Sequence, residues 1–325
     1  MRRVSGLVLA GLGAFLTLIA VLLPTYIASQ VIEFPLNEFE TATLTATHAS
    51  YFSAITLKQV NDVNIEATDT IKGDPASGSD SIAVWSEFSY VYDRTSKQPV
   101  DAISRTFAFD RRTAELLNCC GESINGNSSI NQSGIVGYVF PFSTHKRTYQ
   151  VFDVTTGRPE PFAYTGTETV DGVLAYEFTE DLAPTGIGFS PLSSTKPEYY
   201  SVRLTYWVDP ETGALLQVHQ DEDQYLVNPA TSARAATLFK ADLATTPATV
   251  RELVGLDNSG RKKIALLTTI LPLVLGILGV IAIVIGILLT RKPRRRGTVA
   301  DPPAPPERKS WFDPAEPQPG SGSRW

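Results

Sequence analysis

The chain has few of the residues that most often perform catalysis or bind metals. Its 325 residues include three histidines, His48, His145 and His219, which are far apart in the sequence and belong to no recognisable ligand motif. It also has no G-x-S-x-G nucleophile motif, no H-E-x-x-H zinc motif and no glycine-rich phosphate-binding loop. We therefore predict that the protein is not an enzyme, with no catalytic residue, no cofactor and no metal.

Cysteine is equally scarce, and the only two, Cys119 and Cys120, are adjacent. The C-x-x-C spacing of redox enzymes is thus absent. In an oxidising compartment the pair is expected to form a vicinal disulfide with a structural role, because a bond between neighbours closes a small ring and fixes a tight turn. Two free buried thiols and a link to another chain are the alternatives.

One acidic run, Asp221-Glu222-Asp223, is similar to the metal-binding motif of sugar transferases. No donor-binding fold accompanies it in the sequence. We interpret this run as the solvated end of a strand.

Charge is missing altogether from two long stretches. Ile264 to Thr290 has no charged residue, and as a helix at about 1.5 Å per residue it would span roughly 40 Å, enough to cross a bilayer. Val4 to Leu23 is a second such run, preceded by Arg2 and Arg3. A cleaved signal peptide is the alternative for the first run. Its length and the lack of a clear cleavage site favour an uncleaved anchor.

The basic residues that flank these runs predict the topology. Arg2 and Arg3 precede the first run, and a cluster of Arg and Lys at 291–296 follows the second. By the positive-inside rule, we expect a cell-membrane protein with two spans and both termini in the cytoplasm. The predicted divisions are a transmembrane helix at 1–23, an extracytoplasmic β-rich domain at 24–262, a second transmembrane helix at 263–290 and a disordered cytoplasmic tail at 291–325.

Basic residues are scarce between the spans. Residues 24–260 contain 30 Asp and Glu but only 15 Lys and Arg. A domain this acidic is not expected to bind nucleic acid.

The region between the spans has the alternating pattern of β-strands. Segments such as Ser81–Tyr92 and Ile103–Asp110 place apolar side chains at every second position. Val170-Asp171-Gly172-Val173 predicts a tight hairpin, and Asp209–Gly213 a second turn. The fold is therefore predicted to be mainly β (α+β), an antiparallel curved sheet or half-barrel.

Helix signals are few between the spans. Thr246 followed by Pro247 is typical of a helix start, and the helix would lead into the second span. Thr231–Leu243 is a further possible helix, with Leu238, Phe239 and Leu243 packing together.

Several segments resemble a known family. They are MRRVSGLVLAGLGAFL at the start, DRRTAELLNCCGE, YVFPFSTHKRTYQVFDVTTGRP, VDGVLAYEFTE and YWVDPETGALL. Together they are similar to the actinobacterial porin PorA family of mycolic-acid bacteria, over nearly all of residues 1–290. Asn118–Gly121 and Phe140–Phe142 are the most specific parts of the match.

The resemblance implies a membrane-anchored protein of the cell envelope with a β-rich extracytoplasmic domain. Some members are linked to the maturation of lipomannan and lipoarabinomannan. A barrel porin needs many amphipathic strands of about ten residues with aromatic girdles, a construction unlike two apolar helices around an acidic domain.

Our main functional hypothesis is that the domain binds or transfers a membrane lipid or lipoglycan precursor. The acyl chain would lie in the concave face of the sheet, and a packed core without a cavity is the alternative. The candidate basic contacts to the headgroup are His145, Lys146 and Arg147. The candidate apolar lining is Trp85, Phe88, Phe107, Phe109, Tyr206 and Trp207. Strand alternation places neighbours such as Tyr206 and Trp207 on opposite faces.

Two alternatives belong to other functional classes. In the first alternative, the protein is a scaffold for glycosyltransferases or transporters of the envelope, with other membrane proteins as partners and no ligand. In the second, it is a channel-forming, porin-like protein.

Overall fold

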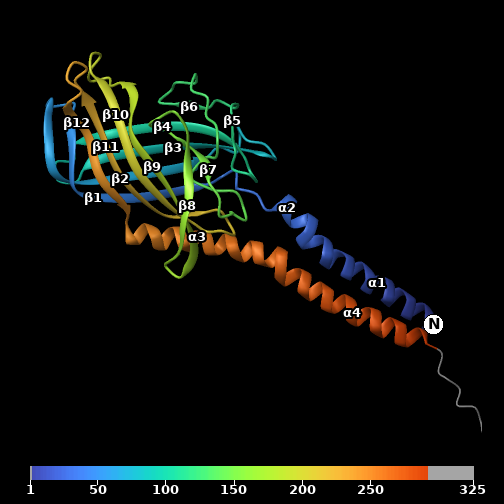
Figure 1. Ribbon diagram of the computed structural model, residues 1–325. Coiled ribbons are helices and arrows are strands. Elements are labelled where there is room, and N and C mark those ends of the chain that lie inside the picture. Colours follow the sequence, from blue (N-terminus) through green and yellow to red (C-terminus); the bar gives the residue numbers. More distant parts are fainter. Residues whose placement is uncertain (1, 292–325) are drawn as a thin grey trace, which may run out of the picture.

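The computed structural model describes residues 2–291, so the predicted cytoplasmic tail lies outside the described residues from 292 on. Helices occupy both ends of this range and strands the middle (Figure 1). The first helical segment consists of α1 (Arg2–Leu22), the π-helical turn η1 (Leu23–Ile27) and α2 (Ala28–Val31). The last consists of α3 (Pro247–Ala265), the π-helical turn η2 (Leu266–Ile270) and α4 (Leu271–Thr290).

The twelve described strands form one curved antiparallel sheet, as the alternating sequence pattern predicts. Its order is β5-β4-β3-β2-β1-β12-β11-β10-β9-β8-β7, and β6 pairs with β4. The strands are β1 (Phe39–Ser53), β2 (Lys58–Gly73), β3 (Ile82–Asp93), β4 (Pro99–Asp110), β5 (Leu116–Leu117), β6 (Ser123–Ile124), β7 (Tyr149–Asp153), β8 (Arg158–Val170), β9 (Val173–Phe189), β10 (Pro197–Val208), β11 (Leu215–Val227) and β12 (Arg234–Thr245). The mainly β, half-barrel fold class is confirmed.

The pairing of the first strand with the last explains how the two helical segments meet. β1 and β12 are antiparallel neighbours, with Leu44 opposite Thr245. The start of β1 therefore lies beside the end of β12. α2 leads into β1, whereas α3 follows β12 and runs beneath the sheet before it continues toward α4 beside α1 (Figure 1).

The predicted turns join neighbouring strands. Val170 pairs with Val173 across the β8–β9 hairpin, and Asp171 and Gly172 have φ angles of 44° and 88°, as a type I′ turn requires. In the β10–β11 turn, Asp209 Oδ1 accepts hydrogen bonds from the backbone N–H groups of Glu211 and Thr212.

One predicted helix is wrong. Residues 231–243 belong mostly to β12, which pairs with both β1 and β11. Phe239 and Leu243 are four residues apart, a spacing that fits one face of a helix and equally one face of a strand. Ala241 lies between them and packs in the same core cluster, so the period is two.

The two faces of the sheet differ in what covers them. On the concave face, aromatic side chains such as Trp85, Phe107 and Phe109 pack against the segment at residues 130–152. On the convex face, Val250 and Val254 of α3 pack against the sheet. The helix begins as predicted, with Thr246 Oγ1 accepting a hydrogen bond from the N–H of Thr249.

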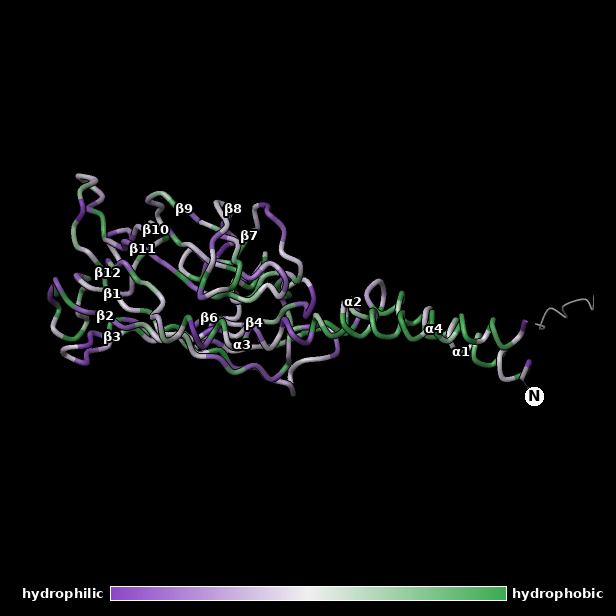
Figure 2. Tube along the Cα trace, turned by 90° about the horizontal axis from the view of Figure 1, so that it is seen from below, coloured by the Kyte–Doolittle hydropathy of each residue, from purple (hydrophilic) through white to green (hydrophobic). Residues whose placement is uncertain are grey.

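Beyond the sheet, α1 and α4 run side by side as an antiparallel pair (Figure 1). Figure 2 shows that this pair is almost uniformly hydrophobic, whereas the sheet mixes hydrophilic and hydrophobic residues. Two helices, Arg3–Val31 and Pro247–Thr290, are long and apolar enough to cross a membrane among the described residues.

Candidate functional sites: the helix pair and an acidic cavity

Glycines hold the two apolar helices at close range. A Cβ added to Gly13 would lie 2.6 Å from the carbonyl oxygen of Gly279, and one added to Gly6 would lie 2.8 Å from that of Gly286. These approaches require glycine because any larger residue would push the backbones apart. The spacing of seven residues on both helices, 6 to 13 and 279 to 286, repeats the contact two turns along. This spacing of glycines within two charge-free runs is a signal that the sequence carries.

Large apolar side chains cover the outside of the same pair. On α1, Val8 and Phe15 are 67% and 58% exposed, and on α4, Val280 and Ile281 are 54% and 49% exposed. Such a surface is stable only against lipid or against other apolar helices.

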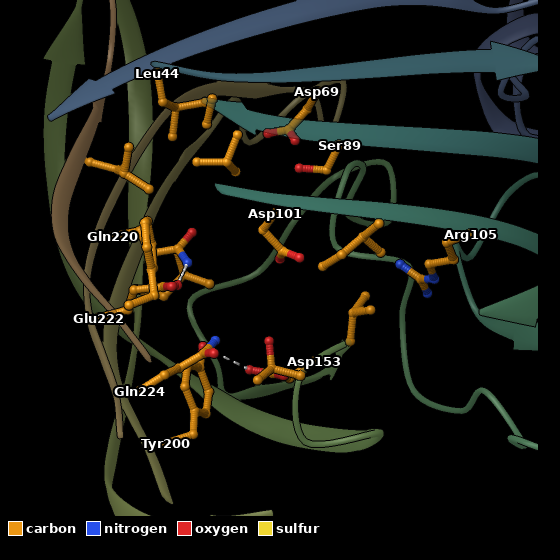
Figure 3. Close-up of a pocket in the computed structure, with 18 of the residues that line it drawn as sticks. Leu44, Asp69, Ser89, Asp101, Arg105, Asp153, Tyr200, Gln220, Glu222 and Gln224 are labelled. Carbon is orange, nitrogen blue, oxygen red and sulfur yellow. Dashed lines mark hydrogen bonds between the residues drawn. The ribbon is translucent and has the colours of Figure 1, made fainter. Parts of the chain in front are cut away.

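The concave face of the sheet encloses a second candidate site, a cavity of about 460 Å³. Its volume lies in the range of ligand sites, roughly 300–1,000 Å³. Seven carboxylates line it, and each comes from a different strand: Asp69 on β2, Glu87 on β3, Asp101 on β4, Asp153 on β7, Glu180 on β9, Glu198 on β10 and Glu222 on β11. Figure 3 shows four of them, Asp69, Asp101, Asp153 and Glu222, around one open space.

Arg105 is the single basic residue in the lining. Its side chain is 1% exposed, and its guanidinium lies over the ring of Phe107 at 4.5 Å and over that of Phe152 at 5.0 Å. Arg105 Nε donates to Gln132 Oε1 at 2.7 Å, and Arg105 Nη1 lies 3.8 Å from Glu87 Oε2. Tyr138 donates a hydrogen bond to the other oxygen of Glu87. The guanidinium of Arg105 is therefore paired with the carboxylate of Glu87 and with no other carboxylate of the lining.

Burial raises the pKa of the innermost carboxyl groups. The pKa of Glu180 is raised to about 8, first by desolvation and then by repulsion from Asp153 and Glu160. Desolvation likewise raises the pKa of Glu222 to about 8 and that of Glu87 to about 7, although Arg105 opposes the shift at Glu87. Glu180 and Glu222, which unlike Glu87 have no basic residue beside them in the lining, therefore keep their protons to a higher pH than usual.

The predicted ligand residues do not come together at this cavity. Of the six aromatic candidates only Tyr206 lines it. Trp85, Phe107 and Phe109 are buried in the core cluster beside it. Phe88 and Trp207 belong to the convex face, where Phe88 is 51% exposed and Trp207 packs in the cluster under α3.

The predicted headgroup contacts His145, Lys146 and Arg147 are exposed and absent from the cavity lining. Lys146 lies over the rings of Tyr164 and Tyr176, and Arg147 lies over Tyr149. Cys119 and Cys120 form a disulfide in the turn between β5 and β6. That turn is also outside the cavity lining.

Most of the carboxylates were not singled out because polar residues in a strand are read as solvent-facing. Glu222 was interpreted as part of a solvated strand end, and this is wrong: it lies within β11, is 6% exposed and lines the cavity. A signal was present nonetheless. Glu180 is two positions from the buried Phe178, and Glu87 is two positions from the buried Trp85. An acidic residue in phase with buried aromatic residues must point inward.

These features define a membrane protein in which a curved β-sheet is joined to a pair of apolar helices. The sequence model of a family described as Porin PorA matches residues 5–288, and the chain belongs to this family. A protein named Porin PorA from Corynebacterium resistens (strain DSM 45100 / JCM 12819 / GTC 2026 / SICGH 158) is 23% identical over 277 aligned residues. The alignment covers 62% of this chain and 65% of that relative, just under two thirds of its length.

The comparisons contradict the predicted binding or transfer of a lipid or lipoglycan. Both the family and the relative are named as porins, which favours the channel-forming alternative. The cavity gives a physical reason for the error. An acyl chain inside it would face seven carboxylates, and these groups would lose water without gaining a hydrogen bond.

Proposed function

We propose that the protein is a channel-forming protein of the cell envelope and does not catalyse a reaction. The observation that carries the proposal is the match of nearly the whole chain to a family named for porins. The apolar helix pair supports it by supplying a part that is suited to lie in a membrane.

The helices, rather than the sheet, are suited to form the channel wall. A transmembrane barrel presents an apolar band to lipid on the outer face of its strands. The convex face of this sheet instead carries polar residues, including Glu66 and Lys72 on β2 and Thr43 on β1. Among the described residues, the two ends of the sheet, β5 and β7, do not pair directly with each other, and only isolated bridges from Ile135 to Glu115 and to Val151 connect them.

A channel made from these helices requires several copies of the chain. α1 and α4 are in close contact at their glycines, which leaves no room for water between them. The exposed apolar residues on the outside of the pair provide a surface through which copies can associate. The channel would then be surrounded by helix pairs from several chains.

The antiparallel helix pair also supports a topology of two spans. It places residues 2 and 290 at the same end of the pair and the sheet at the other. Arg2 and Arg3 are basic, so we assign this end to the cytoplasm and the sheet to the outside.

The charge of the outer domain predicts a preference for cations. With 30 acidic and 15 basic residues between 24 and 260, the domain attracts cations and repels anions near the mouth of the channel.

Recordings from planar bilayers test the proposal with the purified full-length protein. The expected result is discrete conductance steps, together with a native mass that corresponds to several chains. A protein that inserts into liposomes but gives no steps, and has the mass of a single chain, would overturn it.

A further inference from the structure

The cavity on the concave face has more acidic residues than basic ones in its lining. Glu87 has Arg105 as its partner, and the other six carboxylates have no Lys, Arg or His among the lining residues. A lining of this composition repels anions and offers no compensation for its own charge.

Glu180 is the clearest sign that a ligand completes the site. Its side chain is 1% exposed and lines the cavity. Within the described part of the chain, neither of its carboxylate oxygens has a hydrogen-bond partner. A buried carboxyl group without partners is costly, and a donor brought by a ligand would remove that cost.

The remaining lining fits a flexible hydrocarbon. Apolar side chains line the same cavity as the acidic ones, among them Leu44, Leu204, Val218, Phe239 and Leu243. The cavity therefore offers both carboxyl groups and apolar surface to a ligand.

We propose that this cavity binds a small linear polyamine, a molecule in which ammonium groups alternate with short methylene chains. Each ammonium group donates hydrogen bonds to a carboxylate, with Glu180, Asp153 and Glu222 as the deepest contacts. The methylene chains pack against the apolar side chains. A bare divalent cation fits less well, because no group of three or more His, Cys, Asp or Glu side chains with metal-binding geometry occurs among the described residues.

Polyamine binding should be linked to proton release. The raised pKa of Glu180 and Glu222 means that both groups hold protons near pH 7 in the empty cavity, and an ammonium beside them favours ionisation. Affinity is thus expected to rise as the pH approaches 8. Both carboxyl groups interact with other polar groups. Those around Glu180 are Asp153, Glu160, Arg158, Tyr200 and Tyr206. Those around Glu222 are Gln220, Asp101, Asp153, Asp221 and Tyr200.

Isothermal titration of the full-length protein in nanodiscs of zwitterionic lipid tests the proposal, with spermidine as the probe near pH 8. We expect saturable binding of one spermidine per chain. Hexanoate should not bind, and hexylamine should bind more weakly because it has one ammonium group. Glu180→Gln and Glu222→Gln should each weaken spermidine binding by about tenfold or more, since each removes one charged hydrogen-bond acceptor.

Asp181→Asn is the matched control. Asp181 follows Glu180 on β9, is exposed, and lies outside the cavity lining, so its loss should leave the affinity unchanged. Thermal unfolding of each variant establishes that it is folded. Equal weakening by Asp181→Asn and Glu180→Gln would show that spermidine only senses the surface charge, and would overturn the proposal. Absence of saturable binding to the folded parent protein would also overturn it. Neither result depends on conductance, so the channel function is tested separately.

Discussion

The helix pair and the sheet bury opposite kinds of residue. Between α1 and α4 the contact is made by glycines, and the large apolar side chains face outward. In the sheet the large aromatic side chains are inside, and so are several carboxyl groups. The solvent explains the first difference, because lipid is as apolar as leucine and helices in it associate through close packing of small residues.

The carboxyl groups inside the sheet have no comparable explanation from the solvent. Burial of Glu180 and Glu222 costs free energy that an apolar residue of the same size would save. The residues of the helix pair are thus suited to lipid, whereas the buried carboxyl groups of the cavity lower the stability of the sheet. Variants of each part can test this distinction.

The largest effect is expected from Gly13→Leu in the helix pair. A leucine side chain cannot fit where the carbonyl oxygen of Gly279 lies within 2.6 Å of the Cβ position, so the helices must separate. We expect conductance in planar bilayers to be lost. Gly11→Leu is the matched control on the same helix, because a Cβ at Gly11 meets no atom within 4 Å. Similar conductance in the two variants would contradict the importance of the close contact.

In the sheet, Arg105→Met should have the next largest effect. The substitution leaves Glu87 buried without its cation and Gln132 Oε1 without its donor, and loss of one partner from a buried pair costs about 3–5 kcal/mol. Urea unfolding of the protein in detergent would measure it. The double variant Arg105→Met with Glu87→Gln should recover much of the loss. If the double variant is as unstable as the single one, the ion pair is not the cause.

Glu180→Gln should stabilise the protein rather than destabilise it. The folded-state pKa of about 8 lies above the ordinary value of 4.5, so between these values the folded state retains a proton that the unfolded state has released. The free energy of unfolding therefore falls as the pH rises from 4.5 to 8. The variant cannot ionise, so near pH 8 it should be more stable by roughly 1–3 kcal/mol and show a shallower slope. Unfolding curves in urea at several pH values check this, and an unchanged slope would argue against a buried proton on Glu180.

The smallest effect is expected at the start of α3. Thr246→Ala removes the hydroxyl that accepts a hydrogen bond from the N–H of Thr249, and should cost about 1 kcal/mol in urea unfolding. Thr246→Ser retains the acceptor and should be close to neutral. Equal losses in the two variants would show that the methyl group, rather than the hydrogen bond, matters at this position.

The sequence was sufficient for features with a local cause. Strand alternation predicted the mainly β sheet, and the turn at Asp171-Gly172 was predicted from residues that tolerate positive φ. Thr246 and Pro247 marked a helix start because capping involves only neighbouring residues.

Features that depend on distant residues were missed. β12 was mistaken for a helix. Its apolar residues fit both the period of a strand and that of a helix, and only its pairing with β1 and β11 decides between them. A cavity on the concave face was predicted, but its acidic lining was not, because the seven carboxylates come from seven strands, one from each. The aromatic candidates were chosen by residue type. Only Tyr206 lines the cavity, because two of the others face the convex side and three pack in the core beside it.

The central claim is that this acidic domain and its helix pair form a channel, and the reversal potential in a potassium chloride gradient tests it most directly. The full-length protein in a planar bilayer should give discrete steps, and the current should reverse at a potential shifted toward that of potassium, because the region at 24–260 carries twice as many acidic as basic residues. An inserted protein that carries no current, or a current that reverses toward the chloride potential, would contradict this account.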